Sequence, residues 1–546
     1  MNKIYRLFVF YSFFAISLVH AKDTTWTVLI HMETDASLSQ WALENLNAMA
    51  QAGSQKKKLN ILVQLHAQGD YLWRYKVDDK KIKQKDHVLI QEHCGNDIVE
   101  GMRWAAKEYP AKNYALILWN HGFGALDTDV FQKPETGKFD WQAEPDSNMA
   151  ACFDNFCFLR KPLLTEYPDH ATYHRGIMLD ANNERSYMTN DIMVETLRTI
   201  SQDVLGKKLG LVGADACKMA MAEICYQIKD YADYFVGAQN CELVDGWPYH
   251  AIFEQLGKNS LEPQEFAQVI VQEFENYYQT HAQKGLYTQS AIDLSLVENV
   301  RDAINSFVMS AQNYAYYNPQ AFQNLVYRAR QRAVNICTAP FYTDLSSFFE
   351  MLVQELTTDR TSNPTSKESQ EQAEHETSEA TETTSTETEQ EISQQNEEIT
   401  VESLVELEQA AFDCAQELHV IIDGNCWQDE ECCAEEEDLE NLFYQLDSET
   451  IEIIIQEMIE SFFQPCDFEE INLAWARNNL IEQGRQVIAA INNAVIANVT
   501  GSSISRARGL SIYFPYNHVE SSYPYTRFAQ ESLWLNFLID ILGCSY

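Results

Sequence analysis

Residues Lys208–Met219 read KLGLVGADACKM, and this stretch decides the fold. Leu209–Ala214 is apolar, contains glycine and has the length of a buried parallel strand. Apolar positions recur at helical spacing from Met219 to Tyr231, which predicts a helix over 219–231. Asp215 and Cys217 are therefore expected at a strand-to-helix turn. Ligands bind at that edge of an open α/β sheet, and a helix N-terminus there would favour the Cys217 thiolate.

A second apolar strand ends in a histidine. Tyr114–Trp119 reads YALILW, and Asn120-His121-Gly122-Phe123-Gly124 follows it. A cysteine and a histidine on adjacent strand ends are the parts of a thiol acyl-transfer site. The residues alone leave a second interpretation open, because a single buried cysteine is usually a small hydrophobic residue and a single histidine a satisfied polar one.

The alternation of strand and helix patterns predicts an α/β fold with a mostly parallel sheet flanked by helices. A largely helical region is expected from Pro248 to about Leu356 and again from Val401. A late strand is expected at Gly509–Phe514, and Tyr71–Val77 should be antiparallel. The other predicted elements are strands at Trp26–Met32, Asn60–Leu65, Gly176–Leu179 and Tyr234–Ala238, and helices at Ser37–Met49, Ile98–Glu108 and Thr189–Thr199.

Three stretches are read as lying outside the packed core. Residues 1–21 have a charged start, an apolar run and a small-residue end, which predicts a cleavable signal peptide and an exported protein. That apolar run is short for a membrane anchor, and no later stretch has the length and apolarity of a membrane span. A long loop is predicted over residues 127–174. Residues 357–400 are rich in Ser, Thr, Glu and Gln, which predicts a disordered acidic linker.

Net charge and cysteine content limit which ligands and which covalent or metal links are expected. The formal net charge of −42 argues against nucleic-acid binding, which needs basic patches. The count of 13 cysteines is odd, so one thiol remains when the others pair. Disulfides are expected in the C-terminal third, and zinc is the alternative there, although no paired C-x-x-C motifs occur at finger spacing. The cysteines concerned are Cys414, Cys426, Cys432, Cys433 and Cys466.

Four blocks of sequence resemble the clostripain family of cysteine peptidases, which belongs to a caspase-like clan with gingipains, legumain and separase. They occur in the family's order and bracket most of the chain. Residues 34–37 depart from the family's Asp/Asn-rich run, and 357–400 looks like an insertion. The blocks are WTVLIHMETDASLSQWALENLNAM from Trp26, YPAKNYALILWNHGFG from Tyr109, GADACKMAMAEICYQIKDYADYFVGAQ from Gly213 with DGWPY from Asp245, and ARGLSIYFP from Ala507.

The resemblance implies a caspase-like fold and an exported cysteine endopeptidase. His121 and Cys217 match the family's catalytic dyad, and the clan pattern points to the backbone N–H groups of Gly122 and Cys217 as the oxyanion site. No cofactor is required by this chemistry. The domains expected are a signal peptide at 1–21, a catalytic core at 22–250, a helical extension at 251–356, the acidic linker at 357–400, and a helical C-terminal region at 401–546 that ends in a strand and a helix.

The resemblance also implies a specificity. Asp215 and Asp245 match acidic positions in the pocket for the residue before the cleaved bond. Two carboxylates there would select Arg, and less readily Lys, in protein or peptide substrates. The alternatives are a helix N-cap for Asp215 and a turn residue for Asp245. Some relatives respond to calcium, so Ca²⁺ stays open, but no EF-hand pattern occurs.

Two alternatives to this function remain at the level of sequence. A catalytically silent relative could bind peptides or proteins through the same fold. A peptidase with an altered pocket, like caspases or legumain, is the other, and the acidic positions argue against it. Several clan members are activated by cleavage between the His and Cys elements, which makes basic residues of the long loop candidate self-processing sites: Lys133, Lys138, Arg160 and Lys161.

Overall fold

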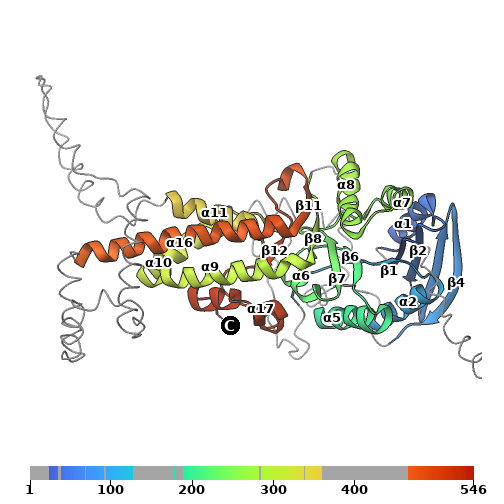
Figure 1. Ribbon diagram of the computed structural model, residues 1–546, viewed down its shortest axis with the longest axis horizontal. Coiled ribbons are helices and arrows are strands. Elements are labelled where there is room, and N and C mark those ends of the chain that lie inside the picture. The colour runs from blue at the N-terminus through green and yellow to red at the C-terminus, as the bar shows by residue number, and fades with distance from the viewer. Residues whose placement is uncertain are drawn as a thin grey trace, which may run out of the picture. The chain divides into compact units, whose positions relative to one another are not determined.

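The computed structural model describes residues 24–34, 38–67, 69–91, 94–126, 177–178, 188–281, 285–336, 339–358 and 465–545 (Figure 1). The chain divides into two compact units, 1–359 with 473–546 and 360–472. The predicted signal peptide and long loop lie outside the described residues, as do residues 359–400 of the acidic linker. So do Cys414, Cys426, Cys432 and Cys433, and the side chain of Cys466.

Nine of the described strands form one sheet in the order β11-β8-β7-β6-β5-β1-β2-β3-β4. The pairs from β7 to β2 are parallel, and the outer pairs on both sides are antiparallel. This arrangement, with helices on both faces, confirms the predicted α/β fold class. The strands are β1 Trp26–Glu33, β2 Leu59–His66, β3 Tyr71–Asp78, β4 Lys81–Leu89, β5 Asn113–Trp119, β6 Leu209–Asp215, β7 Ala232–Gly237, β8 Thr288–Asp293 and β11 Val495–Thr500.

Alternating side chains of the buried strands enter two separate hydrophobic cores. In β1, Val28 and Ile30 pack in one core while Leu29 packs in the other, as the two-residue period of a strand requires. One core is closed by α1 Ser39–Ala52, α7 Tyr249–Lys258 and α8 Pro263–His281. The opposite core is closed by α2 Cys94–Glu108, α5 Asn190–Thr199 and α6 Ala222–Ile228 (Figure 1).

A largely helical region extends the second core. Within the first unit, residues of α16 pack with those of α9 and α11, and Asn479 donates a hydrogen bond to Ser310 Oγ at 3.0 Å. Three short strands form a second sheet in the order β12-β10-β9. The elements are α9 Val297–Tyr317, α10 Pro319–Arg332, β9 Asn335–Ile336, β10 Ala339–Asp344, α11 Leu345–Thr358, α16 Pro465–Ala494, β12 Ser511–Tyr513, α17 Arg527–Glu531 and α18 Trp534–Asn536.

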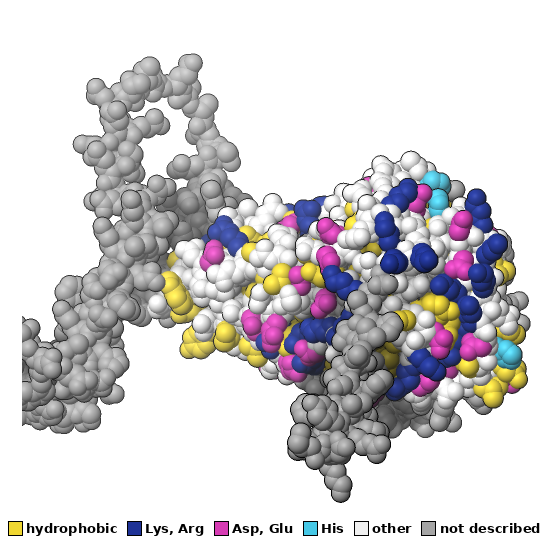
Figure 2. Space-filling model, turned by 45° about the vertical axis from the view of Figure 1, so that its right-hand side comes forward, with side chains coloured by type: hydrophobic (Ala, Val, Ile, Leu, Met, Phe, Trp, Pro, Cys, Tyr) yellow, Lys and Arg dark blue, Asp and Glu magenta, His cyan; other side chains and the backbone are white. Residues whose placement is uncertain are grey.

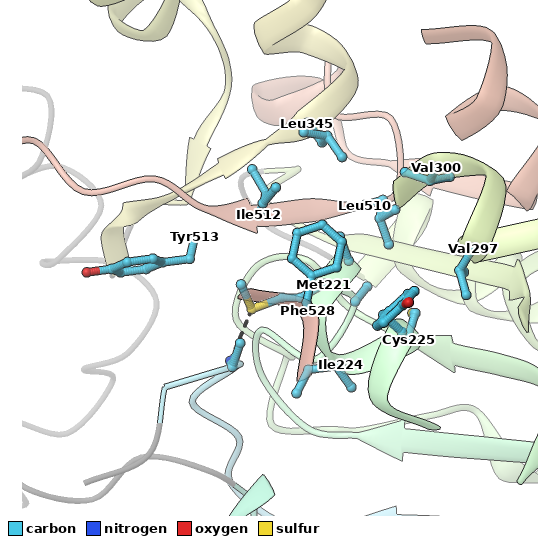
Figure 3. Close-up of a cluster of buried hydrophobic side chains, with 14 of the residues drawn as sticks. Met221, Ile224, Cys225, Val297, Val300, Leu345, Leu510, Ile512, Tyr513 and Phe528 are labelled. Carbon is cyan, nitrogen blue, oxygen red and sulfur yellow. Dashed lines mark hydrogen bonds between the residues drawn. The ribbon is translucent and has the colours of Figure 1, made fainter. Parts of the chain in front are cut away.

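The late strand β12 packs directly against α6, the helix that follows Cys217. Figure 3 shows Ile512 of β12 and Met221 and Ile224 of the α6 region in one cluster of buried side chains. Met221 and Ser511 form a bridge, and the amide of Tyr513 donates to the buried Glu223 carboxylate at 2.8 Å. Residues almost 300 positions apart therefore support the same element.

Several element boundaries differ from the sequence predictions. The helix expected from Met219 begins at Ala222, so 219–221 is not helical. Strands β8 and β10 occur in a region predicted to be mostly helical, and β4 had no predicted counterpart. The late strand is shorter than predicted, at Ser511–Tyr513. Of the strand expected at 176–179, the described residues Ile177 and Met178 show only isolated pairing of Ile177 with Gly122 and Met188.

The surface shown in Figure 2 carries basic and acidic side chains intermixed over the described residues. Residues 401–464, which lie outside the described part, contain many Asp and Glu but neither Lys nor Arg, so they contribute much of the net charge of −42. Among the helices of the described ranges, none is long and apolar enough to cross a membrane.

Candidate active site

The sheet register brings His121 and Cys217 to the same edge. Trp119 at the end of β5 pairs in parallel with Asp215 at the end of β6. His121 follows Trp119 by two residues, and Cys217 follows Asp215 by two residues. The backbones stay together beyond the strands. A Cβ placed on Gly122 would lie only 2.3 Å from the carbonyl oxygen of Cys217. The His-Gly segment and the cysteine turn are thus in direct backbone contact.

A backbone amide from a neighbouring loop, rather than a helix, contacts the Cys217 sulfur. Because α6 begins five residues after Cys217, the predicted placement of the thiol at a helix N-terminus was wrong. Instead the amide of Glu242 donates to Cys217 Sγ at 3.2 Å. Lys218 takes a left-handed conformation (φ +62°) and donates its amide to Asn240 at 2.9 Å. The amide of Ala220 likewise donates to the carbonyl of Ala238, so this segment pairs with the neighbouring loop and the helix starts late.

Hydrogen bonds on both sides of His121 fix its backbone. The buried side-chain amide of Asn120 donates to the carbonyl of Glu33 in β1 at 2.7 Å. The backbone N–H of Asn120 donates to the carbonyl of Asp215 at 3.3 Å. The carbonyl of His121 accepts from the amide of Met178 at 3.1 Å. The histidine segment is therefore tied to the strands on both sides of β5.

The residues after His121 are held by the helical region. Tyr342 of β10 donates its hydroxyl to the carbonyl of Phe123 at 2.8 Å and accepts from the amide of Leu126 at 3.3 Å. The amide of Ala125 donates to Met221 Sδ at 3.3 Å, which is the hydrogen bond drawn at Met221 in Figure 3. No sequence pattern indicates Tyr342 in this role, because it lies more than 200 residues from His121.

Asp215 is a buried carboxylate at the end of β6. It is 4% exposed, and its Oδ2 accepts from the amide of Trp247 at 3.1 Å and from the hydroxyl of Tyr249 at 2.7 Å. Burial raises the pKa of Asp215 to about 7, although both hydrogen bonds act to lower it. The N-cap alternative is wrong, because the residue before α6 is Met221.

Asp245 lies on the turn that covers Asp215. The hydroxyl of Tyr277 donates to Asp245 Oδ2 at 3.1 Å, and Asn45 donates to its carbonyl at 2.9 Å. Gly246 follows with φ +69°, as the turn interpretation expected, and a Cβ there would lie 3.0 Å from Asp215 Oδ2. The structure therefore brings the two predicted aspartates to neighbouring positions.

Sequence reasoning missed a third carboxylate, that of Glu242. Burial and the nearby Asp215 raise the pKa of Glu242 well above its usual value. Asp215, Glu242 and Asp245 all act to raise the pKa of the Tyr278 hydroxyl, so all three lie near that hydroxyl. We call these three residues the acidic cluster. Its third member has no motif of its own, and only its burial makes it noticeable.

Three aromatic residues near the site are buried. Trp119 is 3% exposed and donates its indole N–H to Asn45 at 2.9 Å. Trp247 and Tyr249 pack in the same core as Trp119. They form the wall behind Asp215 rather than an open surface.

No metal site is evident in the described ranges, where no group of three or more His, Cys, Asp or Glu side chains is arranged to hold an ion. The calcium expectation stays untested. None of the described cysteines is in a disulfide, and those expected to pair lie outside the described side chains. The described cysteines are Cys94, Cys217, Cys225, Cys241 and Cys544.

A thiol and an imidazole at the carboxyl edge of a parallel sheet are the parts of a cysteine-peptidase site. The chain matches the sequence profile of the clostripain family over residues 30–146 and 165–540, and it belongs to that family of cysteine proteases. No protein with a curated description matches it.

Two solved structures of C11 cysteine proteases are similar to this chain at low identity. A secreted C11 cysteine protease from Bacteroides thetaiotaomicron, bound to an irreversible peptide inhibitor, is 19% identical, covers 60% of this chain and 78% of its own, and has a TM-score of 0.41. An inactive zymogen C11 protease from Parabacteroides distasonis is 15% identical, covers 93% of this chain and 97% of its own, and has a TM-score of 0.46.

Proposed function

We propose that this cysteine protease is an exported endopeptidase that cleaves after Arg, and less readily after Lys, with His121 and Cys217 as its catalytic dyad. The observation that carries the proposal is the sheet register. Trp119 of β5 pairs with Asp215 of β6, and His121 and Cys217 each lie two residues beyond this pair. Gly122 lies against the Cys217 backbone. Export rests on the signal-peptide pattern of residues 1–21.

In this mechanism the thiolate of Cys217 attacks the scissile carbonyl carbon and forms a C–S bond. His121 gives a proton to the leaving amine as the C–N bond breaks, and water then hydrolyses the thioester. The amide of Glu242, 3.2 Å from Sγ, donates a hydrogen bond that favours the charged form of the sulfur. Gly122 and Cys217 are the proposed backbone donors to the oxyanion.

The proposed specificity rests on uncompensated negative charge beside the nucleophile. Asp215 is two residues before Cys217, and Asp245 lies on the turn that covers it. Neither carboxylate forms an ion pair with a described side chain. A cationic substrate side chain would supply the missing partner, and the planar guanidinium of Arg suits two carboxylates better than the ammonium of Lys.

The test is hydrolysis of matched fluorogenic peptides that end in Arg, Lys, Asp, Asn or citrulline, the neutral analogue of Arg. Wild type is compared with Cys217→Ala and with Cys544→Ala, a control thiol remote in sequence from the dyad. Cleavage after Arg, weaker cleavage after Lys and loss of both only in Cys217→Ala are expected. Because the long loop holds candidate processing sites, intact and nicked chains are assayed separately.

Other outcomes assign the site differently. Cleavage after Asp or Asn would keep Cys217 as nucleophile and reject the acidic pocket. If no peptide is cleaved by intact or nicked chain, with reductant and Ca²⁺ present, the alternative of a catalytically silent peptide-binding module replaces the proposal.

A further inference from the structure

Glu242 connects the nucleophile to the acidic cluster. Its backbone amide contacts Cys217 Sγ, and its carboxylate lies close enough to Asp215 for the two charges to interact. A single residue therefore touches the sulfur with its main chain and extends the negative charge around Asp215 with its side chain.

The Glu242 carboxylate is shielded from solvent and has no cationic partner among the described residues. Both of its oxygens are buried, and neither has a well-formed hydrogen bond. The indole N–H of Trp247, in a side chain 1% exposed, acts on it as a weak hydrogen-bond donor and lowers its pKa. A buried carboxylate is normally paired with a cation, so this one lacks the partner that a cationic ligand would supply.

The surroundings contain acids and hydroxyls but no described cation. Asp215 faces Glu242 from the end of β6, Tyr249 from α7 and Tyr278 from α8, while Cys241 precedes it on its own loop. No Lys, Arg or His forms an ion pair with Glu242 or with Asp215 in the described residues. Two adjacent buried carboxylates without a counterion repel each other, so one of them holds a proton until a cation arrives.

We propose that Glu242 is a specificity-determining residue that shares a proton with Asp215 in the free enzyme and accepts the cationic side chain of the substrate together with it. This inference rests on the proposed cleavage after Arg or Lys. Binding of the cation displaces the shared proton, because the positive charge then stabilises both carboxylates. The pocket is consequently neutralised by the substrate and not by a residue of the protein.

Two consequences follow. Glu242→Gln removes one charge at nearly constant shape, so kcat/KM for the Arg peptide should fall by roughly tenfold to hundredfold, clearly more than kcat/KM for the citrulline peptide. In wild type, the ratio of kcat/KM for Arg to that for citrulline should rise as pH increases through about 7, where burial places the pKa of Asp215. The ratio removes the titration of the nucleophile, which both peptides share.

The experiment measures that ratio from pH 5.5 to 8.5 for wild type, Glu242→Gln, Glu242→Ala and the control Glu254→Gln. Glu254 is a carboxylate of α7 that pairs with Lys258 on the surface. The reaction of Cys217 with iodoacetamide is followed in parallel. A lower and less pH-dependent ratio in both Glu242 variants, with wild-type alkylation rates and a wild-type ratio in the control, is the expected result.

The other results separate the inference from the function on which it rests. If both Glu242 variants keep the wild-type ratio, Glu242 is a spectator and the inference is wrong, while cleavage after Arg stands. If Arg and citrulline peptides lose activity equally, or alkylation slows, Glu242 acts on the nucleophile and not on the substrate charge. If wild type itself does not prefer Arg over citrulline, the proposed specificity fails first.

Discussion

Replacing Gly122 by alanine should separate the backbone contact at the site from the general stability of the fold. The added Cβ would lie 2.3 Å from the carbonyl oxygen of Cys217, whereas ordinary contact begins at 3.4 Å. The two backbones must therefore move apart by about 1 Å. Neither atom belongs to a flexible side chain, so the shift falls on the nucleophile turn itself.

The expected loss follows from that displacement. A misplacement of about 1 Å at a reacting group costs about a hundredfold in rate, so kcat/KM for the Arg peptide should fall by that order. Overpacking of this kind costs about 1–3 kcal/mol of unfolding free energy, which is enough to measure and leaves a large chain folded. The assays are peptide hydrolysis and chemical denaturation of the same preparations.

Gly484→Ala is the matched control. Gly484 lies in α16, where an added Cβ would meet a side-chain methyl of Val353 at 2.9 Å rather than backbone. Helix propensity favours alanine there by up to about 1 kcal/mol, so the chain should stay folded. Activity should be unchanged because the added Cβ contacts no residue of the site. Activity of Gly122→Ala within threefold of wild type would refute the claim that the His-Gly segment and the Cys217 turn are held in register by this contact.

Three further predictions concern the supports of the site. Burial raises the pKa of Glu223 to about 7, so the folded chain keeps a proton that the unfolded chain loses near 4.5. Stability should fall by about 3 kcal/mol as pH rises from 4.5 to 7, and denaturation of Glu223→Gln should lack that slope. Tyr342→Phe removes the hydrogen bonds to the segment after His121 and should cost about 1–2 kcal/mol, with a smaller loss of kcat/KM than Gly122→Ala; an unchanged denaturation midpoint would contradict it. The candidate processing residues are Lys133, Lys138, Arg160 and Lys161. Replacing all four by alanine should leave the chain intact in mass spectrometry. Continued cleavage between His121 and Cys217 would place processing elsewhere.

Local sequence was sufficient for the central strands and for the positions of His121 and Cys217. Each of these side chains follows an apolar run of strand length, and parallel pairing brings such ends together. The alternative of a turn at Asp245 also agrees with the structure, because a glycine with positive φ follows it.

Long-range contacts account for what local sequence could not show. The apolar residues 219–221 have helical spacing, but they are buried outside the helix, and Met221 pairs with Ser511 of β12 far along the chain. Strand β11 likewise pairs with β8 across some 200 residues. Glu242 was missed because an unpaired carboxylate is recognisable only once its neighbours in space are known.

The central claim is that Cys217 reacts beside a pocket that requires positive charge. The most direct measurement is labelling by a peptidyl chloromethyl ketone that ends in Arg, with the modified residue located by mass spectrometry. We expect the adduct on Cys217, formed at least tenfold faster than with the citrulline analogue and absent from Cys217→Ala. An adduct on another cysteine, or equal rates for the charged and neutral reagents, would contradict the account.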